Sequence, residues 1–239
     1  MESERVDGRG PYELRPATIT KGYLDTVPGS ALIAMGNTRV ICTVSLEDRV
    51  PAFLVGTGKG WLTAEYGMLP GSSSRRISRE SATGRVNGRS REIQRLIGRT
   101  LRAIIDLGSL GERTLHVDCD VIQADGGTRT AAITGSYVAL AEAIKKITRE
   151  ENINKSPLLD AVAAVSVGLV EGRVLLDLCY AEDVKAETDM NIAMTGRGGI
   201  VEIQGSAEGR PFSRREADRM LDVANEGINT LLALQQEVA

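Results

Sequence analysis

The sequence predicts a mixed α/β fold in one domain spanning residues 1–239, and three observations lead to that prediction. The chain is 42% hydrophobic over 239 residues, which is enough to bury a sizeable core. Short β-rich runs pair around tight turns, and three longer segments repeat apolar residues at helical spacing. Because hairpins dominate the strand signals, we expect mixed or antiparallel sheets rather than a doubly wound parallel sheet.

The elements follow from local patterns of apolar and turn residues. Two hairpins are predicted, one turning at Gly36-Asn37 and one at Glu171-Gly172. The last helix should begin with a capping box formed by Ser213 and Glu216. In chain order the expected elements are the hairpin 30–46, a strand-like run from residue 61, the helix 90–106, the strand 112–124, the helix 128–150, the hairpin 158–180, the strand 199–209 and the helix 213–238.

Composition argues against several classes of protein. The cysteines at 42, 119 and 179 lie far apart in apolar runs, so we expect buried core residues. With His116 as the one histidine and no CxxC pair, a zinc site is not expected. The N-terminus has no apolar signal core, and no run of eighteen apolar residues occurs. We therefore expect a soluble, cytoplasmic protein with no membrane partner.

Nine arginines, no lysine and two glutamates occupy the segment from Gly71 to Ile105. This segment has a formal charge of +7, so the rest of a chain whose net charge is −3 carries −10. A basic block in an acidic chain indicates a site for phosphates or a polyanion. Residues 71–90 are rich in Gly and Ser and predict a flexible loop, whose arginines we assign to nucleic-acid contacts. These loop arginines are Arg75, Arg76 and Arg79. For the helical arginines at 95, 99 and 102 we favour a solvated face or salt bridges.

A glycine turn, Asp125-Gly126-Gly127, stands between the strand 112–124 and the helix 128–150. Unpaired N–H groups at a helix start attract anions, and glycines let an anion approach the backbone closely. Thr128 and Arg129 add a hydroxyl and a forked cation. The alternative is a plain helix cap by Thr128. No dinucleotide fingerprint is present, and the "GTGKG" of residues 56–60 lacks the Ser or Thr and the helix of a Walker phosphate loop.

Carboxylates gather after the second hairpin, at positions 177, 182, 183, 187 and 189. Acids close together raise one another's pKa or bind a divalent cation, and magnesium prefers one or two carboxylates with phosphate oxygens and water. The alternative is an exposed acidic loop. Together with the turn that could hold an anion, these carboxylates are the groups that a site for phosphoryl transfer needs.

Three stretches of the chain, taken together, resemble one family. They read "GWLTAEYGMLPG" followed by "GRSREIQRLIGRTLRAIID", then "DCDVIQADGGTRTAAITG", then "LLDLCYAEDVKAETDMNIAMTGRGGIVEIQGSAEG". They are similar to the ribonuclease PH family of phosphorolytic 3′→5′ exoribonucleases, which are related to polynucleotide phosphorylase and to exosome ring subunits. The similarity runs from about Arg15 to the last helix. It implies a ribonuclease PH-like fold of the ribosomal S5 domain 2-like kind, a homohexamer built as a trimer of dimers, and RNA substrates such as the 3′ ends of tRNA precursors.

The resemblance also implies a reaction and its residues. Inorganic phosphate, not water, would cleave the last phosphodiester of RNA and release a nucleoside 5′-diphosphate. The loop arginines would guide the RNA, and Mg²⁺ would be the cofactor. The matching residues are Arg89, Gly127, Thr128 and Arg129 for phosphate, and Asp183 and Asp189 for catalysis and the metal.

Three positions depart from the family pattern. Gly71 stands where many relatives carry arginine, and Arg91 replaces an apolar residue, which puts RNA affinity in question. Asn191 stands where the polynucleotide phosphorylase relatives carry lysine, which puts the metal surroundings in question. Two other classes remain as alternatives, an inactive ring subunit that only binds RNA or partners and a two-metal hydrolytic nuclease. The first would lose the arginine or aspartate set, and the second would want more carboxylates and histidines.

Overall fold

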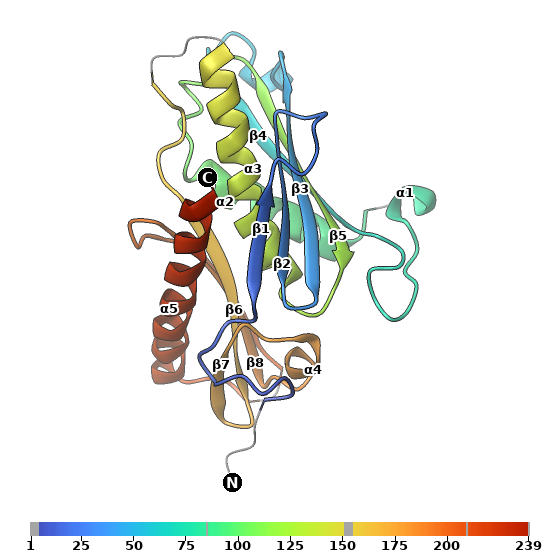
Figure 1. The fold of residues 1–239 in the computed structure, drawn as a ribbon, viewed down its shortest axis with the longest axis vertical. Helices are drawn as coiled ribbons and strands as arrows, with labels where there is room; N and C mark the ends of the chain where they lie inside the picture. Colours follow the sequence, from blue (N-terminus) through green and yellow to red (C-terminus); the bar gives the residue numbers. More distant parts are fainter. Residues whose placement is uncertain (1–4, 85, 151–154, 209, 239) are drawn as a thin grey trace.

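The computed structural model describes residues 5–84, 86–150, 155–208 and 210–238, so Arg85 of the arginine block lies outside the described residues. A five-stranded sheet has the order β1-β2-β3-β5-β4, and a four-stranded sheet has the order β7-β6-β8-β9 (Figure 1). Strands β4 and β5 run parallel, and the other pairs of named strands are antiparallel. The prediction of mixed or antiparallel sheets is therefore confirmed.

The elements have the following bounds in the structure. The strands are β1 (Ala17–Lys21), β2 (Gly29–Met35), β3 (Thr38–Glu47), β4 (Trp61–Met68), β5 (Thr114–Gln123), β6 (Val162–Val170), β7 (Arg173–Leu176), β8 (Thr188–Thr195) and β9 (Ile200–Ala207). The helices are η1 (Ala52–Leu54, a 3₁₀ turn), α1 (Glu80–Thr83), α2 (Gly88–Arg102), α3 (Thr128–Glu150), α4 (Tyr180–Asp183) and α5 (Arg214–Val238). No helix among the described residues is long and apolar enough to cross a membrane.

Both predicted hairpins and the predicted capping box are present. Glu171 and Gly172 have φ of 50° and 74°, the left-handed conformations that a two-residue hairpin turn requires. At the start of α5, the Ser213 N–H and hydroxyl donate to the Glu216 carboxylate, and the Glu216 N–H donates to the Ser213 hydroxyl. Local chemistry therefore determines these turns and this helix start.

The sequence analysis missed β1, β8 and the short helices α1 and α4. Strand β8 lies in the segment for which an exposed acidic loop was the alternative, and that alternative is wrong for residues 188–195. Six of its eight residues are buried, and β6 and β9 pair with its two edges. Helix α1 lies within the loop predicted at 71–90.

Helix α3 joins the two sheets. It contacts β2 and β3 of the first sheet and β6 of the second, while α2 packs on β4 and α5 packs on β6 and β7. One cluster of buried side chains includes residues of both sheets. A Cβ at Gly135 would lie 2.8 Å from Ile33 Cγ2 and 3.0 Å from Cys42 Sγ, so glycine lets α3 lie close to the first sheet. The three cysteines are free and buried, as predicted.

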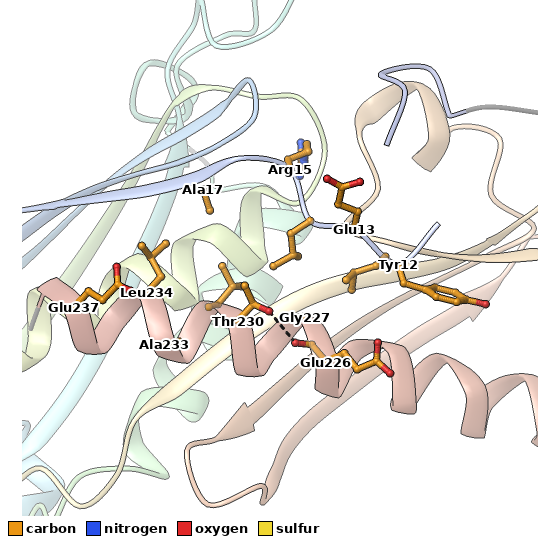
Figure 2. A pocket seen from close by; sticks show the side chains of 13 residues that line it. Tyr12, Glu13, Arg15, Ala17, Glu226, Gly227, Thr230, Ala233, Leu234 and Glu237 are labelled. Carbon is orange, nitrogen blue, oxygen red and sulfur yellow. Dashed lines mark hydrogen bonds between the residues drawn. The ribbon is translucent and has the colours of Figure 1, made fainter. Parts of the chain in front are cut away.

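The N-terminal segment crosses from α5 to the second sheet. A cavity of about 610 Å³ lies between residues 12–17 and α5 (Figure 2). The Arg219 guanidinium lies 4.9 Å from the centre of the Tyr12 ring, and the Leu176 N–H donates to the Pro11 carbonyl. These contacts hold the segment against both elements, and they place Arg15 beside the loop that follows β7.

Candidate active site

A cleft of about 1530 Å³ collects most of the predicted site residues. Its walls come from the glycine turn, the first turns of α2 and α3, the loop after β4, helix α4 and strands β8 and β9. The predicted residues that line it are Arg75, Arg89, Gly127, Thr128, Arg129, Asp183 and Asp189. The fold therefore brings together residues that are more than a hundred positions apart in the sequence.

The glycine turn lies directly on the backbone that leads into α4. Gly126 and Gly127 have φ of 73° and 64°, and a Cβ at Gly126 would lie 2.5 Å from the Leu178 carbonyl oxygen. The Thr38 hydroxyl donates to the Gly126 carbonyl at 2.7 Å, and the Tyr180 N–H donates to the Asp125 carboxylate at 3.2 Å. Only glycine fits this contact, which fixes the distance between the turn and α4.

A buried ion pair holds the same two segments together. The Arg15 guanidinium bonds the Asp177 carboxylate at 2.6 Å and 2.9 Å, and both side chains are at most 3% exposed. The same guanidinium donates to the carbonyl of Asp125 at 2.5 Å and to that of Gly126 at 3.5 Å. Arg15 thus connects the loop after β7 with the glycine turn.

A second buried ion pair occupies another of the clustered acids. Arg5 pairs with Glu182 at 2.6 Å and donates to the Leu176 carbonyl at 2.9 Å. Asp177 and Glu182 therefore bind arginines of the N-terminal segment and do not line the cleft. The sequence analysis missed this role. The available signal was the set of arginines at 5, 9 and 15 in a segment with no other assigned function.

Arg89 and Arg129 both line the cleft beside the glycine turn. Burial lowers the pKa of Arg129, and the nearby Arg89 guanidinium lowers it further, while Glu92 and Asp189 oppose the shift. Arg129 donates to the Gln204 side chain at 2.7 Å, and the Gln204 amide bonds Glu92. Two cations that act on one another favour an anion in the cleft. Helix α3 begins there at Thr128, and the first N–H groups of a helix have no acceptor within it.

The two predicted catalytic carboxylates line the same cleft as these cations. Asp183 is the last residue of α4, and Asp189 lies on β8, where the Ser206 hydroxyl donates to it at 3.2 Å. Partial burial at the cleft wall raises the pKa of Asp183, and the Asp189 charge raises it further, against Arg129 and Arg89. Asn191 lies on the same face of β8 as Asp189 and also lines the cleft.

Two carboxylates, with oxygens of a bound phosphate and water, are a ligand set that Mg²⁺ accepts. Among the described residues, no group of three or more His, Cys, Asp or Glu side chains is arranged to hold a metal on its own. The chemistry of the donors at this cleft therefore fits a magnesium ion shared with phosphate better than a metal held by protein alone.

The basic block divides between the cleft and other contacts. Arg75 lines the cleft, whereas Arg76 and Arg79 are exposed and do not. Burial raises the pKa of Asp120 on β5, and the nearby Arg79 charge opposes that shift.

The arginines near the end of α2 make other contacts. Arg99 pairs with Glu202 at 3.4 Å. Arg102 lies 4.7 Å from the centre of a Trp61 ring and donates to the Leu62 carbonyl. The last two arginines therefore make contacts within the chain.

Comparisons with known proteins match most of this chain to one family. Residues 13–146 match the 3′ exoribonuclease family, domain 1, and residues 160–227 match domain 2 of the same family. A ribonuclease PH of Moorella thermoacetica is 57% identical over 234 residues, which cover 98% of this chain and 94% of that protein.

Solved structures share the fold. Rice (Oryza sativa) Rrp46 superimposes with a TM-score of 0.79 at 21% identity, covering 97% of this chain and 98% of that one. A chain of the Archaeoglobus fulgidus exosome with RNA bound to the active site gives a TM-score of 0.80 at 22% identity, covering 97% and 92%. At these identities the likeness concerns the fold alone, and it agrees with the mixed α/β prediction.

We expect Gly126→Ala to lower the free energy of unfolding by more than Gly172→Ala. Both positions have positive φ, which costs a residue with a Cβ ~1–2 kcal/mol. A Cβ at Gly126 also meets the backbone of residues 178–180, for about 1–3 kcal/mol more, whereas nothing lies within 4 Å at Gly172. Denaturant unfolding measures both losses, and equal losses would contradict the close contact of turn and loop.

We expect Asp183→Asn to raise the melting temperature at pH 7 in buffer without magnesium. The fold raises the pKa of Asp183 above its ordinary 3.8, so ionisation of this group destabilises the folded state once the pH rises above that ordinary value. The gain should disappear near pH 3, where the carboxyl is protonated in both states. Asp25→Asn, at an exposed turn, is the control. A melting temperature that falls at pH 7 would show that Asp183 stabilises the fold.

Proposed function

This chain belongs to the 3′ exoribonuclease family, and from that membership we propose how its cleft removes nucleotides from RNA. The activity is that of ribonuclease PH, a phosphorolytic 3′→5′ exoribonuclease and tRNA nucleotidyltransferase that acts on tRNA precursors. Inorganic phosphate is the co-substrate, and a nucleoside 5′-diphosphate is the product. The residue roles below are our assignments for this chain.

Orthophosphate binds between Arg89 and Arg129, on the backbone N–H groups of residues 127–129. One observation carries this assignment: Arg89 and Arg129 line the same cleft at a helix start whose preceding residues are glycines with positive φ. The Arg129 guanidinium is held in place by Gln204, so its remaining N–H groups are preorganised for an anion. Two observations support a role of Thr128 toward the anion rather than as a plain helix cap: it is the first residue within α3, and its hydroxyl bonds Tyr66.

The bound phosphate is the nucleophile of the reaction. One of its oxygens attacks the phosphorus of the last phosphodiester, the new P–O bond forms and the bond to the 3′ oxygen breaks. The leaving 3′ oxygen takes a proton from Asp189 or from a bound water, which completes the 3′ hydroxyl of the shortened RNA. A phosphodiester becomes a phosphoanhydride of similar energy, so the reaction also runs in reverse.

Asp183 and Asp189 would hold Mg²⁺ together with phosphate oxygens. When bound, the ion offsets negative charge that gathers on the reacting phosphates. Ser206 orients the Asp189 carboxylate for this role, through the hydroxyl that donates to it. Asn191, a neutral residue on the same face of β8 as Asp189, adds no cation to the carboxylate pair.

RNA approaches over the loop that follows β4. Arg75 at the cleft, with Arg76 and Arg79 on the same loop, contacts the RNA backbone, and such binding tolerates different sequences.

We further propose a single catalytic domain over residues 1–239, a homohexamer built as a trimer of dimers, and a cytoplasmic location. One buried cluster across both sheets supports the first proposal. Relatives that form exosome assemblies support the second, and three buried free thiols suit a reducing compartment.

We expect wild-type protein to release nucleoside diphosphates from RNA only when phosphate is present, and Arg129→Ala to lower turnover roughly 100-fold or more. A preorganised cation contributes ~2–4 kcal/mol to a transition state. Product analysis by chromatography, with and without phosphate, measures both effects. Arg197→Ala, on the exposed β8–β9 turn, is the control and should keep full turnover.

Monophosphates formed without phosphate would indicate a hydrolytic nuclease instead. A folded protein that binds RNA and releases no product would indicate an inactive subunit. Near-normal turnover of Arg129→Ala at saturating phosphate would remove Arg129 from the phosphate site while leaving the activity itself standing.

We expect Arg75→Ala to weaken RNA binding at low salt and to reduce the slope of log K against log salt by about 0.7, the value for one phosphate contact on a single strand. Arg149→Ala, at the far end of α3, should leave both quantities unchanged. Fluorescence anisotropy with a labelled RNA over a salt series measures them. An unchanged slope for Arg75→Ala would mean that this arginine does not contact the RNA backbone.

A further inference from the structure

Tyr66 places a phenol group directly beside the candidate phosphate site. Its side chain extends from β4, is 4% exposed, and its hydroxyl lies 2.8 Å from the Thr128 hydroxyl, on the first residue of α3. Among the described residues it is the one aromatic side chain that is more than nine-tenths buried. Its neighbour Thr128 is 6% exposed and lines the cleft.

The direction of this hydrogen bond depends on what occupies the cleft. Either hydroxyl can donate to the other, because each has one proton and acceptor lone pairs. An unprotonated phosphate oxygen in the cleft only accepts. If Thr128 donates to that oxygen, the Tyr66 proton must go to Thr128, and both hydroxyls are then fully used. The two bonds also polarise one another in the same direction.

We propose that Tyr66 is a positioning residue for the reaction: its hydroxyl donates to Thr128 and thereby aims the Thr128 proton at the orthophosphate nucleophile. This inference rests on the proposed phosphate site. It adds a residue outside the cleft lining, since Tyr66 touches Thr128 and not the phosphate.

The surroundings of the phenol agree with a role toward an anion. Burial raises the pKa of Tyr66, while Thr128, Arg89 and Arg129 act against that shift, so the hydroxyl lies at the cationic end of the cleft. Thr130, two residues further along α3, makes a different contact. Its hydroxyl donates to the Gly127 carbonyl at 2.9 Å and so bonds the backbone at the start of the helix. The Thr128 hydroxyl is therefore the one aimed away from the helix backbone, between the phenol and the cleft.

A double-mutant cycle tests the inference. Tyr66→Phe removes one hydroxyl and keeps the ring in the core, and Thr128→Val removes the other hydroxyl at nearly constant volume. We expect each single variant to raise KM for phosphate about fivefold, as loss of one hydrogen bond of ~1 kcal/mol predicts, with kcat within about twofold and KM for RNA unchanged. The double variant should be no worse than Thr128→Val alone.

Two further measurements keep the test decisive. Tyr137→Phe, a partly buried tyrosine on α3, is the matched control and should leave KM for phosphate unchanged. The rise in melting temperature on adding inorganic phosphate measures binding without catalysis, and it should shrink in Tyr66→Phe as in Thr128→Val.

The outcomes separate this inference from the proposed function. Normal phosphate affinity in Tyr66→Phe together with weak affinity in Thr128→Val would overturn the role of Tyr66 and leave the phosphate site intact. Additive effects in the double variant would show that Tyr66 does not act through Thr128, and would also overturn it. A wild-type protein without phosphate-dependent activity would instead fail the proposed function.

Discussion

The candidate site depends on one buried ion pair, between Arg15 and Asp177. A carboxylate this deeply buried requires a partner, and removing either member of such a pair costs several kcal/mol. Because the guanidinium is a planar fork, it also reaches the carbonyls of the glycine turn. One side chain therefore fixes the turn that would hold phosphate relative to the loop that leads to Asp183. The close backbone contact at Gly126 then sets their separation.

The cleft brings opposite charges together within one small volume. Arg89 and Arg129 line it with Asp183 and Asp189, and the charges of both arginines act on Asp183. Burial is the larger cause of the lowered pKa of Arg129 and of the raised pKa of Asp183, and the like charge beside each adds to the shift. A phosphate relieves the first repulsion and a divalent cation relieves the second. The fold thus stores electrostatic strain that both ligands of a phosphorolytic reaction would remove.

Local chemistry explains which parts of the fold were predictable. The turns at 36–37 and 171–172 and the capping box of α5 are encoded within a few residues, and all three were predicted from sequence. Strand β8 was missed because it is buried on both faces and carries Asp189 and Asn191, so neither alternation nor an unbroken apolar run marks it. The residues now found in the cleft could be named from short motifs. The pairing of Arg15 with Asp177, 162 positions apart, leaves no local pattern, and neither does the contact of Tyr66 with Thr128.

The phosphate dependence of Arg15→Lys tests the central claim most directly. Lysine keeps a cation opposite Asp177 but cannot bond the carboxylate and the two turn carbonyls at once. We expect a folded protein, judged by circular dichroism, whose half-saturating phosphate concentration in RNA phosphorolysis rises about tenfold or more, the effect of ~1.4 kcal/mol. Arg149→Lys should keep the wild-type value. An unchanged phosphate requirement in folded Arg15→Lys would show that the turn holds its position without this ion pair, and would contradict the account.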